Sequence, residues 1–284
     1  MMDQGIEVQA VPSVAAGRAR GGRATQEDAL VCLHDPASDA RLLVLADGMG
    51  GDGAGELASA GVIEIARRLW QQGLWREQAG PLFLETFCQA AHAELRRRGE
   101  GLAGASPHST VVALLLRGRR ACWAHVGDSR LYRFRGARCL GRTEDHSVAQ
   151  LKVARGELAA DAMGEDADQH KLLRGLGGPQ PPQVEHGLAA LRPGQSFVLC
   201  SDGAWERLST GELGRFARRR NMQAALHEAL DRAVERGGAD GDNVSLIFAR
   251  IGWAQWWRAR GAGWWARLAR RDAVRAGDVG IRQA

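Results

Sequence analysis

Three largely apolar runs in this chain of 284 residues end at an aspartate, and this pattern constrains the fold more than any other sequence feature. The runs are residues 42–46 before Asp47, 122–126 before Gly127-Asp128, and 197–201 before Asp202. Short continuous apolar runs are typical of buried strands. A carboxylate at the end of a buried strand is costly to desolvate unless something binds it. The pattern therefore predicts strands that carry carboxylates to a polar site.

Other segments complete the expected secondary structure. Further strands are expected at 110–116, 131–134 and 244–251, and helical spacing of apolar residues predicts helices at 56–71, 82–98 and 222–235. Residues 156–173 are acidic and weakly periodic, and are interpreted as a mobile surface segment that could act as a lid. Strands in tandem with long helices favour an α+β fold in which helices flank stacked sheets.

Charge divides the chain into a neutral body and a basic tail. Residues 1–252 hold 31 basic and 31 acidic residues, whereas residues 253–284 hold seven Arg and two acidic residues. A neutral body excludes a general polyanion binder, so no nucleic-acid partner is expected. We predict one domain at 1–252 and a Trp/Arg-rich C-terminal tail at 253–284.

The tail permits three interpretations. It holds five of the nine Trp, and positions 253, 256, 257, 260 and 264 fall on one helical face. Gly261 and Gly263 weaken a continuous helix. The tail could pack on the domain or extend from it partly disordered, dock on a partner, or lie on an anionic membrane surface.

The cysteines and the apolar runs bear on the compartment. The five cysteines are scattered and form no CxxC pair, which is typical of buried thiols in a reducing compartment. The N-terminal residues show no signal pattern, and no run approaches the roughly 18 apolar residues of a membrane span. A cytoplasmic protein is expected.

The aspartates Asp47, Asp202 and Asp242 are candidate metal ligands. Clustered carboxylates repel one another unless cations fill the pocket between them. Oxygen ligands favour Mg²⁺ or Mn²⁺ over Zn²⁺, and two such ions can share a carboxylate and activate a water for in-line attack on phosphorus. The alternative is that each aspartate only caps a helix or forms a turn after a strand.

The segment Arg-Ala-Thr-Gln-Glu-Asp, residues 23–28, adds a guanidinium and two carboxylates. Arg23 suits bidentate binding of a phosphate. Glu27 and Asp28 suit a metal ion or its waters. The alternatives are a surface salt bridge for Arg23 and an exposed carboxylate for Glu27.

Seven motifs occur in a fixed order along the chain. They are RATQEDA (23–29), VLADGMGGDGAGELAS (44–59), STVVALLL (109–116), AHVGDSRLY (124–132), EDHSVAQL (144–151), PGQSFVLCSDGAWERL (193–208) and DGDNVSL (240–246). In this order they resemble the metal-dependent Ser/Thr protein phosphatases of type 2C, in their bacterial branch, over residues 10–251. The resemblance implies a four-layer α-β-β-α sandwich, with two antiparallel sheets stacked face to face and helices on both outer sides.

The resemblance also implies a set of metal ligands. Asp47 would bridge two Mn²⁺ or Mg²⁺ ions, and the Gly48 carbonyl would ligate one of them. Asp202 and Asp242 would complete the other metal site, and Glu27 would bind beside Asp47.

Further roles follow from the same resemblance. Arg23 would bind the substrate phosphate, and Asp28 would hold metal-bound waters. Asp128 would help to bind a third, weaker metal ion, although it could also be a plain turn residue. Asn243 would orient the preceding ligand, and residues 147–170 would form a flap beside the site.

Three positions depart from the family pattern. Gln26 stands for the usual Asn, Asp52 stands for the His of a frequent GMGGH motif, and Met49 stands where many eukaryotic members carry a catalytic His. Bacterial relatives also carry Met at this place. The general acid is therefore unassigned, and a metal-bound water is a candidate.

The expected function is a phosphoprotein phosphatase that hydrolyses phosphoserine and phosphothreonine by attack of a metal-bridging water. Its expected partners are a phosphorylated protein substrate and a cognate bacterial Ser/Thr kinase, with secretion-system control as a possible setting by family analogy. The first alternative is a catalytically weak protein of the same fold that acts as a regulatory binding module. The second is a hydrolase of small phosphoesters.

Overall fold

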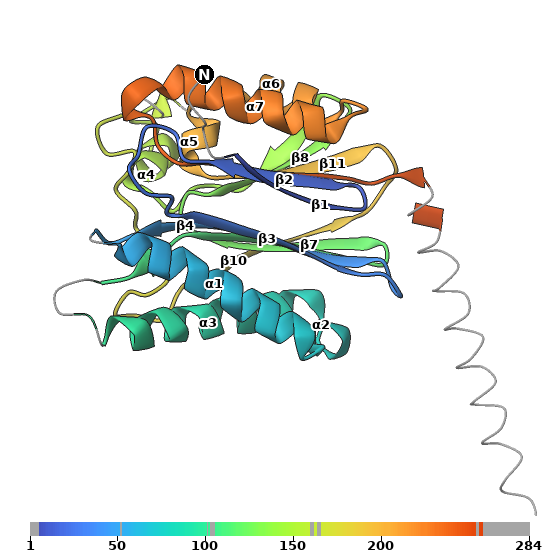
Figure 1. Ribbon diagram of the computed structural model, residues 1–284, viewed down its shortest axis with the longest axis horizontal. Helices are drawn as coiled ribbons and strands as arrows, with labels where there is room; N and C mark the ends of the chain where they lie inside the picture. The colour runs from blue at the N-terminus through green and yellow to red at the C-terminus, as the bar shows by residue number, and fades with distance from the viewer. Residues whose placement is uncertain are drawn as a thin grey trace, which may run out of the picture.

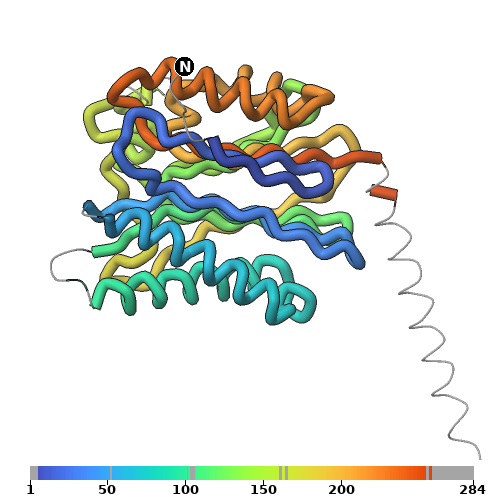
Figure 2. The backbone as a smooth tube through the Cα atoms, viewed as in Figure 1, coloured from blue at the N-terminus to red at the C-terminus, as the bar shows by residue number. Residues whose placement is uncertain are grey.

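A sheet of six antiparallel strands runs through one half of the computed structural model, which describes residues 6–51, 53–100, 102, 106–159, 162–163, 166–253 and 256–257. In spatial order its strands are β1 (Glu7–Val11), β2 (Val14–Ala19), β12 (Val244–Arg250), β11 (Gln195–Cys200), β8 (Arg130–Arg135) and β9 (Arg138–Arg142). Strands β2 and β12, which lie far apart in the sequence, are neighbours in this sheet (Figure 2).

A second antiparallel sheet stacks on the first. In spatial order its strands are β10 (Glu185–Ala190), β7 (Arg120–Val126), β6 (Val111–Arg117), β4 (Ala40–Met49) and β3 (Asp28–Asp35), and the short β5 (His108–Ser109) pairs with β4. The position of β4 between the helices and the other sheet explains why its sequence is continuously apolar. Leu42 and Val44 pack toward the helices, whereas Leu43 and Leu45 pack toward the other sheet, so both faces of the strand are buried.

Helices cover both outer faces of the stacked sheets (Figure 1). The β3–β4 side carries α1 (Ala54–Gln71), α2 (Leu74–Glu77) and α3 (Gly80–Gly99), and the opposite side carries α5 (Asp202–Trp205), α6 (Thr210–Ala217) and α7 (Met222–Gly237). The short α4 (Val148–Ala154) follows β9, and a 3-10 turn at Gly238–Asp240 follows α7. The four-layer α-β-β-α sandwich expected from the sequence is confirmed.

Most of the expected elements form within a few residues of their predicted bounds, but one prediction about a strand end is wrong. Strand β4 does not stop at Asp47; it continues to Met49, because Gly48 and Met49 pair with β5. The pattern of apolar residues did not predict β1, β2, β3, β5, β9 or β10. Strands β1, β5 and β9 are short, and β2 and β10 are rich in Gly and Ala. The predicted flap contains α4 and a series of turns in its described part.

The start of the basic tail contacts the domain. Trp256 Nε1 donates a hydrogen bond to the Leu191 carbonyl at 3.1 Å, and the Arg119 guanidinium lies 4.7 Å from the Trp256 ring centre. The helical face expected farther along the tail lies outside the described residues, as does residue 52. Within the described ranges, no helix combines the length and the apolar character needed to cross a membrane.

The layer between the two sheets should contribute much of the stability. We expect Leu45→Ala to lower the free energy of unfolding by about 2–5 kcal/mol, because Leu45 is fully buried between the sheets and its loss leaves a cavity. Leu82→Ala is the control, since Leu82 is 55% exposed on α3 and should cost about 0.5 kcal/mol or less. Urea unfolding followed by circular dichroism measures both, and equal values would contradict the assignment of the core.

Candidate metal centre

Each sheet delivers carboxylates to the same end of the sandwich, where α4 and α5 lie (Figure 1). In one sheet, Asp28 at the start of β3 pairs with Asp47 in β4. Residues paired in this way have Cα atoms about 4.5–5.5 Å apart. In the other sheet, Asp202 follows β11 and Asp242 precedes β12. Because β11 and β12 are antiparallel neighbours, the end of one lies beside the start of the other.

Close backbone contacts bring these segments together. A Cβ on Gly203 would overlap the Asn243 carbonyl oxygen and lie 3.3 Å from the Asp242 Cβ. The Ser201 hydroxyl links the two sheets by donating a hydrogen bond to Asp28 Oδ2 at 2.9 Å. Carboxylates from both sheets therefore face one site.

Burial and mutual repulsion raise the pKa values of these carboxyl groups. Burial raises the pKa of Asp47 well above its ordinary value, and the charges of Asp202 and Asp28 raise it further. Burial also raises the pKa of Asp28 to about 7. The pKa of Asp128 is raised well above its ordinary value by burial and then by Asp202. Ionised carboxylates are thus costly together here, and a hard divalent cation is the ligand that would stabilise them.

The oxygens of Asp47, Asp202 and Asp242 do not form a set within 4.8 Å of one another in the described part of the chain. The Asp242 carboxylate instead contacts Arg23, whose Nη2 donates to Asp242 Oδ2 at 2.6 Å. The Arg23 side chain is 55% exposed, and an exposed ion pair contributes only about 0–1 kcal/mol. The Asp242 carboxylate can therefore leave Arg23 at small cost and turn toward a cation.

Two glycines let the backbone approach the site where a side chain would block it. A Cβ on Gly48 would overlap the Gly55 carbonyl oxygen at the start of α1. A Cβ on Gly55 would lie only 2.5 Å from Glu27 Oε1 and 2.9 Å from the Gly48 carbonyl oxygen. The Gly48 carbonyl and the Glu27 carboxylate therefore lie near each other, as the two ligands expected beside Asp47 would need to.

Asn243 ties the segment that carries Arg23 and Glu27 to the start of β12. Its Nδ2 donates to the carbonyls of Arg20 at 2.8 Å and Thr25 at 3.0 Å, and its Oδ1 accepts from the Glu27 N–H at 2.7 Å. Its backbone N–H donates to Asp242 Oδ1 at 2.7 Å. The buried Asn243 therefore positions residues on both sides of the site.

A buried ion pair between Arg130 and Asp145 supports α5. Arg130 donates to both oxygens of Asp145, at 2.8 and 2.6 Å, and its guanidinium lies 3.4 Å from the Trp205 ring centre. Trp205 Nε1 donates to the Asp128 carbonyl at 3.0 Å. These contacts fix Asp128 next to the helix that begins with Asp202.

Two side chains that the sequence analysis did not identify, those of His170 and Glu206, also reach the site. His170 Nδ1 lies 3.7 Å from Asp202 Oδ2 and 3.8 Å from Glu206 Oε1. Burial and then Asp202 raise the pKa of Glu206 to about 7. The spacing of Asp202 and Glu206, four residues apart at a helix start, could have identified Glu206. His170 has no such signal, because it comes from the distant end of the predicted flap.

The histidines His125 and His146 form a buried stacked pair with ring centres 4.5 Å apart. His125 Nε2 donates to the Glu144 carbonyl at 2.8 Å, and His146 Nδ1 accepts from the Gly127 N–H at 3.2 Å. The pKa of His146 is lowered to about 4 by burial and then by His125. Both rings are buried, and they pack against each other in the interior of the domain.

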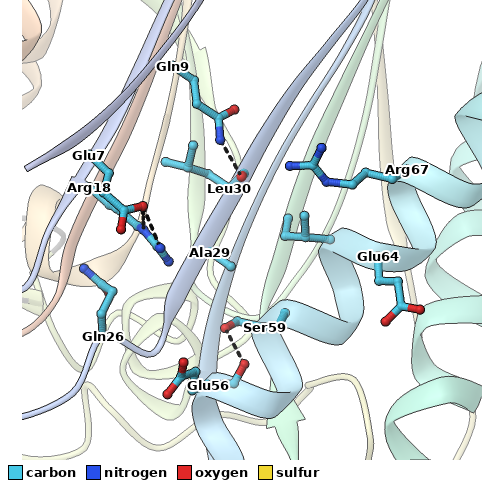
Figure 3. A pocket seen from close by; sticks show the side chains of 12 residues that line it. Glu7, Gln9, Arg18, Gln26, Ala29, Leu30, Glu56, Ser59, Glu64 and Arg67 are labelled. Carbon is cyan, nitrogen blue, oxygen red and sulfur yellow. Dashed lines mark hydrogen bonds and ion pairs between the residues drawn. The ribbon is translucent and has the colours of Figure 1, made fainter.

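A separate cavity of about 460 Å³ lies behind the site between β1, β2, β3 and α1 (Figure 3). Within it Arg18 pairs with Glu7 at 2.7 Å and donates to the Asp28 carbonyl at 2.5 Å. Gln9 donates to the Leu30 carbonyl at 3.5 Å along the free edge of β3. The residues that line this cavity support the strand that carries Asp28. Their side chains carry charges of both signs and do not form a convergent set of carboxylates.

Comparison with known proteins gives a consistent result. A family model described as protein phosphatase 2C matches residues 18–236. Serine/threonine protein phosphatase PstP of Mycobacterium tuberculosis is 29% identical over 239 residues, which cover 81% of this chain and 43% of PstP. This chain therefore spans less than half the length of that relative. Serine/threonine phosphatase stp of Listeria monocytogenes (strain EGD-e) is 26% identical, over 72% of this chain and 83% of the relative.

Solved structures resemble the whole sandwich. The catalytic domain of PstP in complex with two manganese ions has a TM-score of 0.71 at 28% identity, covering 84% of this chain and 97% of that domain. PppA, described as a key regulatory component of T6SS in Pseudomonas aeruginosa, has a TM-score of 0.63 at 27% identity. The alignment with PppA covers 84% of this chain and 97% of that structure.

The role of Asn243 as a link can be measured through stability. We expect Asn243→Ala to cost about 2–4 kcal/mol, because it removes three side-chain hydrogen bonds of one buried residue at once. The matched control is Asn221→Ala, which removes one exposed cap of α7 and should cost about 1 kcal/mol. Urea unfolding gives both values, and a cost for Asn243→Ala no larger than that of the control would contradict the link.

Proposed function

Because this chain belongs to the protein phosphatase 2C family, we propose that it is a metal-dependent phosphatase of phosphoserine and phosphothreonine in proteins. The observation that carries the proposal is the convergence of Asp28, Asp47, Asp202 and Asp242 on one site, with pKa values of Asp28 and Asp47 raised by burial and by neighbouring charges. Such a site favours cations and excludes anionic substrates unless cations are bound.

The proposal assigns the predicted ligands to two Mn²⁺ or Mg²⁺ ions. Asp47, the Gly48 carbonyl, Asp202, Asp242 and Glu27 would hold them, with Asp28 on their waters and Asp128 contributing to a third ion. When bound, these ions would supply the positive charge that acidifies a water and stabilises the transferring phosphoryl group.

The residues of the chain would then bind and orient the substrate. Arg23 is exposed and paired only weakly with Asp242, so its guanidinium is available to bind two oxygens of a phosphate. Because a water attacks phosphorus, no side-chain nucleophile and no phosphoenzyme are required. The general acid stays unassigned, since Met49 occupies the position of the eukaryotic histidine.

The physiological setting belongs to the same proposal. A Ser/Thr kinase must produce the substrate of such an enzyme, so a cognate bacterial kinase is the expected antagonist. Control of a secretion system is supported by the likeness to PppA. A cytoplasmic location is supported by the free cysteines, which suit a reducing compartment.

The bridging role of Asp47 has a direct test. We expect Asp47→Asn to lower the rate of Mn²⁺-dependent hydrolysis of p-nitrophenyl phosphate at least about 100-fold. Even the loss of a residue that only hydrogen-bonds to a metal ligand lowers metal affinity or activity by about 10–100-fold. Chelator should abolish the wild-type rate, and circular dichroism should show that the variant is folded. Wild-type turnover by the variant would refute the role, and an inert wild-type protein would favour a regulatory binding module. Faster turnover of free metabolites than of phosphopeptides would favour a small-molecule phosphoesterase.

The basic tail is proposed to contact a partner protein or a membrane surface rather than to take part in hydrolysis. We expect removal of residues 258–284 to leave hydrolysis of p-nitrophenyl phosphate within about twofold of wild type, because the described contact of Trp256 is retained. Co-sedimentation with anionic vesicles measures membrane contact by the full chain and by the shortened one. A shortened chain that loses hydrolysis or unfolds would show that the tail is part of the domain.

A further inference from the structure

A groove of about 410 Å³ lies beside the carboxylate site. We call it the proline groove; its apolar residues are Met49, Leu172, Leu173, Pro179, Pro181 and Pro182, and its polar ones are His108, Arg174, Gln180 and Gln183. Its volume is within the range of about 300–1,000 Å³ that is usual for ligand pockets. None of the predicted metal ligands is among the residues that line it.

Two of the chain segments that line the groove start near the carboxylate site. Met49 comes two residues after Asp47 on the same strand, a distance of about 7 Å at the rise of a β-strand. On the other side, Leu172 and Leu173 follow shortly after His170, which lies 3.7 Å from Asp202. The groove is therefore continuous with the site along the chain on two sides.

The backbone of the groove is held in place by hydrogen bonds, while the Leu173 side chain stays accessible. The Leu173 N–H donates to the His146 carbonyl at 2.7 Å, although the Leu173 side chain is 54% exposed. Leu176 exchanges two backbone hydrogen bonds with Ser109, at 2.8 and 3.2 Å. An apolar wall on a fixed backbone can bind an extended segment with little loss of entropy.

The charges of the groove also differ from those of the site. The described residues that line it include Arg174 and no carboxylate. When no cations are bound, the neighbouring Asp47 and Asp202 would repel a phosphopeptide. The groove would not repel it, because no carboxylate lines the groove. A peptide that is anionic near its phosphate and aliphatic farther away complements this arrangement.

We propose that the proline groove binds the substrate segment next to the phosphorylated residue and selects an aliphatic side chain two to four residues away. The proposal rests on the function proposed above, since the phosphate must be held at the carboxylate site. The spacing follows from the strand rise of about 3.3 Å per residue and the distance from Asp47 to Met49. Leu173 is the proposed specificity-determining residue, because it is the exposed aliphatic side chain of the wall nearest in sequence to His170.

The test uses a set of phosphothreonine peptides in a Gly/Ser background. A single Leu is moved through the positions from four before to four after the phosphothreonine, and kcat/KM is measured with Mn²⁺ for the wild type, Leu173→Asp and Leu82→Asp. Leu82 is the matched control, because it is 55% exposed on α3 and does not line the groove. We expect the wild type and the control to prefer Leu at a position two to four residues away by about tenfold, the scale of one lost aliphatic contact.

Leu173→Asp should lose this preference while its hydrolysis of p-nitrophenyl phosphate stays at the wild-type rate. Retention of the preference by Leu173→Asp, or its absence from the wild type, would overturn the proposal. Fluorescence anisotropy measures the binding of a labelled peptide that carries a non-hydrolysable phosphonate. This measurement separates selection of Leu by the groove from hydrolysis at the carboxylate site. If p-nitrophenyl phosphate is not hydrolysed, the proposed function fails, and anisotropy alone then decides whether the groove selects Leu.

Discussion

Repulsion between carboxylates is the constraint on which the arrangement of this chain depends. Asp28 and Asp47 come from one sheet, Asp202 and Asp242 come from the other, and burial raises the pKa values of Asp28 and Asp47. Charged groups in such a place oppose folding unless the surrounding structure holds them. Here the three apolar layers of the sandwich offset that cost, and the site lies at one end of them rather than in their middle.

Polar contacts between distant segments determine the shape of the site. Ser201 joins the sheets through Asp28, and Asn243 joins the segment of Arg23 and Glu27 to the start of β12. Gly48 and Gly55 are required because a Cβ at either position would collide with the backbone or with Glu27. The acidic residues thus provide the oxygens of the site, and their neutral neighbours determine where these oxygens lie.

The segment that closes the predicted flap serves two neighbouring features. His170 contacts Asp202 and Glu206 at the carboxylate site, and Leu172 and Leu173 form a wall of the proline groove only two and three residues later. Hydrogen bonds from Leu173 and Leu176 to residues flanking the site hold this segment against the sheet. Under the two proposals, different residues of this one short segment contact the phosphate site and the surrounding peptide.

The sequence by itself determined the class of fold and the main acidic residues. Strands with continuous apolar runs, helices with helical spacing and ordered motifs around Asp47, Asp202 and Asp242 are local patterns, so they can be read without coordinates. Only the tertiary structure decided that β4 runs on to Met49, that Arg23 pairs with Asp242, and that His170 reaches the site. It also decided the position of the proline groove. The physical reason is that these features are contacts between segments far apart in the chain, which arise from sheet pairing and packing and leave no periodic mark in the sequence.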